Sequence, residues 1–182
     1  MKIYKLQGDL DHLASLINRF KKDDDVTILD GCEKKDWKTI EVKFDPPSRK
    51  RKLKLKDYST IAEPVFSKRA VAAMSEITTE GVQYLPIHCI DTDEELYIVN
   101  VTRLEDCLDY DKSEYTCYDD NYRVMWIEKY CFCPEKVKDL KVFKLVNAAR
   151  GKPFVTDEFA RKIEEKKLTG FKLELVWDSD KT

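Results

Sequence analysis

The chain has 182 residues, of which 37% are charged and 42% hydrophobic, and its formal net charge is −2. This balance is typical of a folded, well hydrated protein with one substantial core, and it excludes a largely disordered chain. No apolar stretch reaches the roughly 18 uninterrupted residues that a membrane span needs, and the first residues lack the apolar segment of a signal peptide. We therefore expect a cytoplasmic protein without a membrane partner, whose six cysteines are reduced thiols.

The N-terminal part of the chain contains short patterns of both strand and helix. A helix capped near Asp9 is indicated by apolar residues at helical spacing up to Ile17. Strands are predicted over residues 2–6, 26–29 and 39–44.

A break in these patterns marks a boundary before the main part of the chain. Residues 45–48, Asp-Pro-Pro-Ser, interrupt regular structure, and a basic run follows at residues 49–56. We place the division here, with residues 1–60 as an N-terminal α/β appendage or subdomain and residues 61–182 as the main α+β domain.

One pattern occurs twice in the main part. Ser67 is placed as the N-cap of a helix that ends before Gly81 and a strand, and Thr156 and Gly170 stand in the same positions later. A hydroxyl at the N-cap satisfies free backbone donors, while glycine tolerates the left-handed turn after a helix. Two ordinary helix-glycine-strand units explain this recurrence at least as well as a duplication does.

The remaining predicted strands indicate the fold class. Residues 171–177 alternate apolar and polar side chains, which predicts a strand with one buried face ending at Trp177. Further strands are expected over residues 96–101, 122–133 and 141–146. The sequence thus predicts an α+β fold with a mixed, largely antiparallel sheet backed by a few helices.

Metal and catalytic sites are weakly supported by the sequence. Cys131 and Cys133 with His88 and Cys89 offer four zinc ligands, but the spacing is unusual for structural zinc, and cysteines packed in a core explain it better. His88 and His12 are the chain's two histidines, and neither has a nucleophile in a suitable register. The five glycines are too scattered for a phosphate-binding loop. We expect no metal, no cofactor and no enzyme, although a site built from buried carboxylates stays open as an alternative.

Charge is segregated along the chain. Residues 34–56 contain ten basic and three acidic residues, whereas residues 91–120 contain eleven acidic and two basic ones. The basic run at 49–56 could follow a phosphate backbone, which makes a nucleic-acid-binding protein the alternative function. No base-stacking aromatic residues accompany the run, so we favour a solvated loop or edge hairpin.

Tyrosines are interleaved with the carboxylates of the acidic stretch, a composition suited to an interface that captures a basic surface. A solvated loop explains the composition equally well. The candidate partner-binding residues are Asp106, Asp109, Tyr110, Asp111, Glu114, Tyr115, Tyr118, Asp119 and Asp120.

Several short segments, in their order and spacing, resemble the immunity proteins of bacterial polymorphic-toxin systems, a family long catalogued as a domain of unknown function. The most specific segment is Leu108-Asp109 followed by Asp111-Lys112-Ser113. The resemblance runs from about residue 64 to residue 177; residues 1–60 and the cysteines at 117, 131 and 133 lie outside it. The other matching segments are residues 65–67, 81–87, 97–101, 154–158 and 168–173.

The resemblance implies a non-enzymatic protein that stays in the toxin-producing cell and neutralises a cognate toxin domain by direct contact. Charge suggests a nuclease as the toxin, because an acidic surface could cover a basic active site and speed the encounter.

Overall fold

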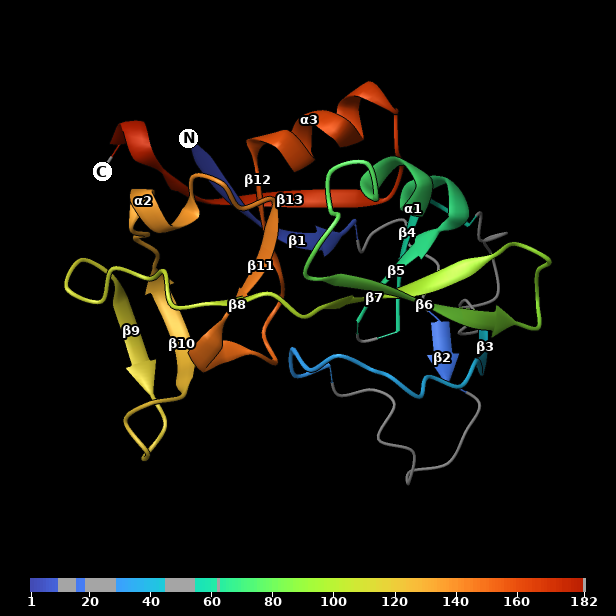
Figure 1. Cartoon of the computed structure of the whole chain (residues 1–182), viewed down its shortest axis with the longest axis horizontal. Coiled ribbons are helices and arrows are strands. Elements are labelled where there is room, and N and C mark those ends of the chain that lie inside the picture. Colours follow the sequence, from blue (N-terminus) through green and yellow to red (C-terminus); the bar gives the residue numbers. More distant parts are fainter. Residues whose placement is uncertain (10–15, 19–28, 45–54, 62, 182) are drawn as a thin grey trace.

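The computed structural model describes residues 1–9, 16–18, 29–44, 55–61 and 63–181 (Figure 1). Two sheets, a separate two-stranded ribbon and three short α-helices make up this part of the chain. None of the described helices is long and apolar enough to cross a membrane. The strands are β1 (Lys2–Gly8), β2 (Leu16–Asn18), β3 (Ile40–Phe44), β4 (Tyr58–Thr60), β5 (Pro64–Ser67), β6 (Val82–Cys89), β7 (Leu96–Val101), β8 (Leu104–Glu105), β9 (Glu114–Cys117), β10 (Val124–Lys129), β11 (Val142–Leu145), β12 (Phe154–Thr156) and β13 (Phe171–Asp178). The helices are α1 (Lys68–Met74), α2 (Pro134–Val137) and α3 (Asp157–Glu165), with 3₁₀ turns η2 (Val146–Ala148) and η3 (Ser179–Lys181).

The sheet-rich α+β fold with mixed strand directions agrees with the sequence prediction, but its division into sheets differs. One sheet has the order β2-β3-β6-β7-β5-β4, another the order β13-β1-β12-β11-β8, and among the described strands β9 pairs with β10 alone. The pairs β3–β6 and β8–β11 are parallel, and the other pairs are antiparallel. A single sheet was the wrong expectation, because periodicity along a strand carries no information about which partner it pairs with.

The first strand lies among the last ones. β1 pairs with β13 over its whole length and with β12 on its other side. The two chain ends therefore meet, with the Ser179 amide donating to the Met1 carbonyl at 2.9 Å. The division of the chain near residue 60 remains a prediction, since residues 45–54 lie outside the described part, and residues 2–8 are integrated into the C-terminal sheet.

Two details of the expected elements need correction. Residues 16–18 form β2, so the helix predicted after Asp9 does not extend to Ile17; residues 10–15 lie outside the described part, as do residues 26–28 of another expected strand. In β13 the expected alternation fails, because Leu175 is 46% exposed while Trp177 is buried. A bulge in the β1–β13 pairing shifts the register there.

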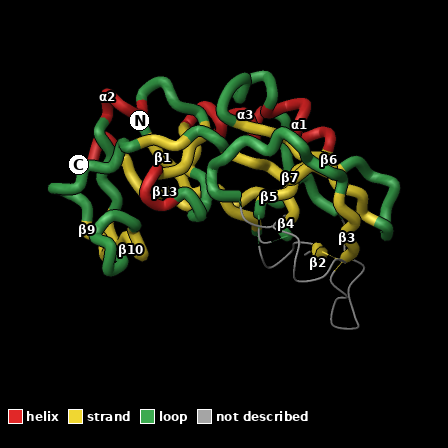
Figure 2. Tube along the Cα trace, turned by 60° about the horizontal axis from the view of Figure 1, so that its bottom comes forward, coloured by secondary structure: helices red, strands yellow, loops and turns green. Residues whose placement is uncertain are grey.

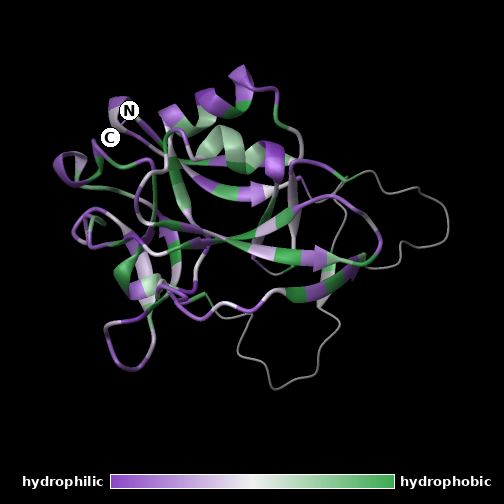
Figure 3. Cartoon of the chain, turned by 45° about the vertical axis from the view of Figure 1, so that its right-hand side comes forward, coloured by the Kyte–Doolittle hydropathy of each residue, from purple (hydrophilic) through white to green (hydrophobic). Residues whose placement is uncertain are grey.

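Local chemistry explains why α1 and α3 begin where they do. Ser67 has an extended backbone, and its hydroxyl accepts the Ala70 amide, so it caps α1. At the start of α3, Thr156 holds the N-cap position but its hydroxyl donates to the Leu140 carbonyl at 3.0 Å instead. Both helices contribute to one hydrophobic cluster that also contains residues of both sheets. Met74 of α1, Phe159 of α3 and Phe66 of β5 belong to it. In Figure 3, α1 is mostly green and α3 mostly purple, which agrees with the greater exposure of α3.

A second cluster supports the region of the ribbon. It joins Phe132, Phe143, Phe154 and Trp177, whose rings meet edge to face or stacked at 5.5–5.9 Å between centroids. Val124 and Ile127 of β10 belong to the same cluster, so one side of the ribbon is fixed to the core.

Candidate functional site

The acidic stretch with its tyrosines folds into a turn and the first strand of the ribbon. Figures 1 and 2 both place the ribbon β9–β10 at one end of the molecule, away from β2 and β3. All nine predicted partner-binding residues therefore lie between residue 106 and the tip of the ribbon, in one region of the fold.

The turn at residues 109–113 is held in place by the segment around Cys131. The Ser113 hydroxyl accepts the Cys131 amide at 3.0 Å and donates to the Cys131 carbonyl at 3.1 Å, while the Asp109 amide donates to that carbonyl at 2.8 Å. Lys112 and Asp109 form an ion pair at 3.0 Å. The segment with the most specific family resemblance thus forms a turn that is hydrogen-bonded to Cys131. The Asp109 side chain is occupied within this turn by its ion pair with Lys112.

The remaining acids differ in how far they are neutralised. Asp120 pairs with Arg123 at 2.5 Å, and Glu114 lies 3.8 Å from Lys129 across the ribbon. Asp111 and Asp119 are exposed, and neither forms an ion pair within the described residues. Asp106 is also exposed and has no ion pair among the described residues. The negative charge available to a partner is therefore smaller than the sequence count suggests, and it is concentrated at Asp106, Asp111 and Asp119.

The outer side of the ribbon carries large side chains that the sequence did not single out. Trp126 is 64% exposed and Met125 52% exposed, although both lie in a strand. Two register shifts in the β9–β10 pairing place Val124 and Ile127 inward and leave consecutive residues outward, so simple alternation could not reveal this arrangement. The large exposed side chains of the ribbon and its tip are grouped here as the aromatic face: Tyr115, Tyr118, Tyr122, Met125 and Trp126. Tyr115, which pairs with the inward Ile127, and Tyr122 form its edge toward a hollow beside the ribbon.

A hollow of about 280 Å³ lies between the ribbon and η2, and we call it the tyrosine hollow. Tyr110 lines the hollow, and its hydroxyl donates to Asp106 Oδ1 at 3.0 Å and accepts from Asn147 Nδ2 at 2.8 Å. Burial and the neighbouring Asp106 carboxylate raise the pKa of Tyr110, so it stays a protonated donor. The lining residues are Asp106, Tyr110, Tyr115, Cys117, Asn121, Tyr122, Val146 and Asn147.

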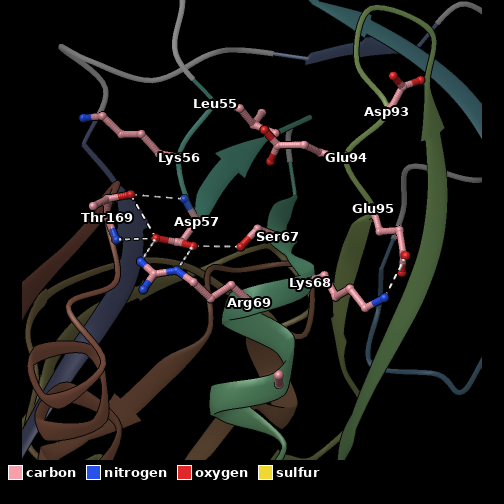
Figure 4. A pocket seen from close by; sticks show the side chains of 11 residues that line it. Leu55, Lys56, Asp57, Ser67, Lys68, Arg69, Asp93, Glu94, Glu95 and Thr169 are labelled. Carbon is pink, nitrogen blue, oxygen red and sulfur yellow. Dashed lines mark hydrogen bonds and ion pairs between the residues drawn. The ribbon is translucent and has the colours of Figure 1, made fainter.

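A larger hollow of about 570 Å³ lies beside the N-terminus of α1, where Figure 4 shows Asp57 surrounded by donors. Arg69 binds both carboxylate oxygens, at 3.0 and 2.6 Å, Ser67 donates to Oδ1 at 2.9 Å, and Thr169 donates its amide and hydroxyl to Oδ2 at 2.8 and 3.0 Å. Burial would raise the pKa of Asp57, but these hydrogen bonds outweigh it and lower the pKa to about 2.

The hydrogen bonds around Asp57 stabilise the fold and leave its carboxylate poorly suited to act as a catalytic base. A carboxylate with such a low pKa is a weak base at neutral pH, and its lone pairs are already occupied. Arg69 also donates to the carbonyls of Lys166 and Lys167, so the pair ties α1 to the end of α3. Nothing in the sequence indicated this hydrogen-bond network, because its members come from distant parts of the chain: Asp57 and Thr169 are 112 residues apart.

The thiols and His88 do not assemble into a metal site. Within the described residues no group of three or more histidine, cysteine, aspartate or glutamate side chains could hold a metal ion. His88 lies exposed on β6, while Cys133 precedes α2 near the ribbon. All six cysteines are free, and burial raises the pKa of Cys107 to about 12, which makes that thiol unreactive.

Residues 49–54 of the basic run lie outside the described part of the chain, so the structure does not place them. Whether the basic run forms a binding site therefore stays a question for the binding experiment below.

The chain matches a known family of proteins over most of its length. Residues 16–178 match the model of an immunity protein family (Imm11). No curated protein matches the chain.

Proposed function

Because the chain belongs to the Imm11 immunity protein family, whose model covers residues 16–178, we propose that it neutralises a cognate bacterial toxin by direct protein–protein contact. Immunity proteins of this kind generally work without catalysis, and we propose the same here. The protein would act in the cytoplasm of the cell that makes the toxin.

The observation that best supports a binding role is the aromatic face beside the acidic turn. Large aromatic side chains are enriched at the centres of protein interfaces, and Trp and Tyr are the most frequent binding hot spots. An exposed tryptophan next to an exposed methionine on a strand exposes apolar area to water, which a partner would cover.

The exposed carboxylates favour a basic partner. Asp111 and Asp119 lie in the turn before β9 and the loop after it, flanking this face in the chain. A basic toxin surface would be attracted to them over about a Debye length, which raises the association rate. We propose a nuclease as the toxin, since a protein that binds phosphates needs a basic surface.

Co-expression with a candidate toxin domain, sought among the genes next to the one for this protein, tests the proposal. We expect restored growth of the toxin-producing host and co-purification of the two proteins at one-to-one ratio. Restored growth without any complex, or with toxin that is chemically altered, would argue for an enzymatic mechanism instead.

Nucleic acid binding through residues 49–56 is tested in the same preparation. A gel shift with duplex DNA and single-stranded RNA at two salt concentrations would reveal backbone binding as a steep loss of affinity with salt. We expect no shift at physiological ionic strength.

A further inference from the structure

We propose that the tyrosine hollow is a receptor site for one arginine side chain of the toxin, which anchors the complex beside the aromatic face. This inference rests on the proposed function, and it adds the chemistry of the contact. The hollow is about 280 Å³ in volume, which is enough for one long side chain and too small for a folded segment.

The walls of the hollow present acceptors and aromatic rings. Asp106 is exposed, and only its Oδ1 is engaged by Tyr110, so within the described residues Oδ2 accepts no hydrogen bond. Lys136 approaches this residue but donates to its backbone carbonyl at 2.8 Å, leaving the carboxylate charge without an ion pair in the described part of the chain. The hollow is therefore negative at one wall.

An unsatisfied buried amide provides independent support. Asn147 is 7% exposed, its Nδ2 donates to the Tyr110 hydroxyl, and its Oδ1 has no hydrogen-bond partner among the described residues. Buried polar atoms are nearly always hydrogen-bonded in native proteins, and an unpaired one costs about 1–3 kcal/mol. Oδ1 is itself shielded from solvent, so a guanidinium in the hollow gains this acceptor through a small rotation of the Asn147 side chain.

The rings favour a guanidinium over an ammonium. Tyr110 and Tyr115 meet edge to face at 5.5 Å, and with Tyr122 three aromatic rings line the hollow. A planar guanidinium stacks on such rings while its five N–H donors reach several acceptors at once, whereas lysine offers a compact and strongly hydrated charge. The ribbon already contains one such contact, with the Arg123 guanidinium 5.1 Å from the Tyr118 ring centre.

Binding of N-acetyl-arginine amide, followed by NMR of the ¹⁵N-labelled full chain, tests the inference without the toxin. We expect saturable shifts of the Asn147 side-chain amide with millimolar affinity. N-acetyl-citrulline amide has almost the same shape without the charge, and it should bind at least tenfold more weakly. Equal responses to the two probes would overturn the proposal.

Two substitutions locate the site. Asp106→Asn removes the charge at the wall and should weaken arginine-amide binding about tenfold, because a hydrogen bond to a charged group is lost. Asp111→Asn removes a charge from the same turn without lining the hollow, and it should bind as the wild type does. A similar affinity for both variants would refute the site. Probe binding without a toxin complex would count against the proposed function alone, and a toxin complex unaffected by Asp106→Asn would count against the arginine site alone.

Discussion

Among single residues, Asp57 carries the largest concentration of hydrogen bonds in the described structure. Its buried carboxylate accepts from Arg69, Ser67 and Thr169, and so joins β4, α1 and the turn before β13. Replacing one member of such a network leaves the others with unmet hydrogen-bonding groups in a site partly shielded from water.

We expect Asp57→Asn to lower the free energy of unfolding by about 2 kcal/mol, because the ion pair with Arg69 and at least one hydrogen bond are lost. The expected loss of stability is moderate because the Arg69 side chain is 55% exposed, so water can solvate its guanidinium in the variant. Urea unfolding measures the change. Asp93→Asn is the matched control, since Asp93 lines the same hollow but is exposed, and it should change stability by less than about 0.5 kcal/mol. Equal stability of the two variants would contradict a structural role for Asp57.

The same carboxylate should make stability depend on pH in the acid range. Its pKa falls from the ordinary 3.8 to about 2 on folding, so its stabilising contribution is complete above about pH 4 and is lost as pH falls toward 2. The difference in unfolding free energy between the wild type and Asp57→Asn should therefore shrink below pH 4, by about 2 kcal/mol in total. Unfolding curves from pH 5 to pH 2 measure it, and a difference independent of pH would rule out the lowered pKa.

Residues whose role is local were predictable, and those whose role depends on distant partners were not. Ser67 was identified as a helix cap because its signal lies within four residues. Asp57 gave no signal, since its partners Arg69 and Thr169 are brought together only by the fold. The assignment of Asp106, Tyr110 and the other acidic-stretch residues to a partner surface remains a prediction.

At the scale of elements, the ribbon β9–β10 combines a fixed inner side with an exposed outer side. Val124 and Ile127 anchor it in a hydrophobic cluster, while Met125 and Trp126 face water. The sequence indicated a strand in this region but not its faces, because two register shifts break the alternation on which such assignments depend. Strands with regular pairing, such as β7 between β5 and β6, were placed correctly.

Trp126→Ala should separate binding from stability. Because the side chain is 64% exposed, its removal should change the free energy of unfolding by less than about 0.5 kcal/mol. Loss of a central aromatic contact should weaken toxin binding by about 2 kcal/mol, or about thirtyfold. Calorimetric titration with the purified toxin domain measures the affinity. Leu175→Ala is the control, because Leu175 is an exposed apolar residue on β13, in the five-stranded sheet and outside the ribbon. Equal affinities of the two variants would remove the aromatic face from the interface.

For the whole molecule, the arrangement of charge matters more than the net charge of −2. The ribbon lies at one end of the molecule in Figures 1 and 2, and the loop between β6 and β7, which also carries acids, lies toward the other end. The family match and the sequence pattern identified the kind of protein, but only the fold shows that its two acidic regions are separate surfaces. A charge effect on binding can therefore be assigned to one end by experiment.

Reversing Asp111 and Asp119 to lysine should slow association with the toxin and reduce the dependence of the association rate on salt. The reason is that these exposed carboxylates have no ion pair among the described residues, so their field reaches an approaching basic surface. Stopped-flow measurements from 20 to 500 mM salt should give roughly tenfold slower association for the variant at low salt and similar rates at high salt. The variant Asp93→Lys with Glu94→Lys changes the net charge by the same amount in the loop between β6 and β7, where both residues are exposed. If this control slows association equally, attraction acts on the net charge of the molecule, and the acidic turn has no special part in guiding the toxin.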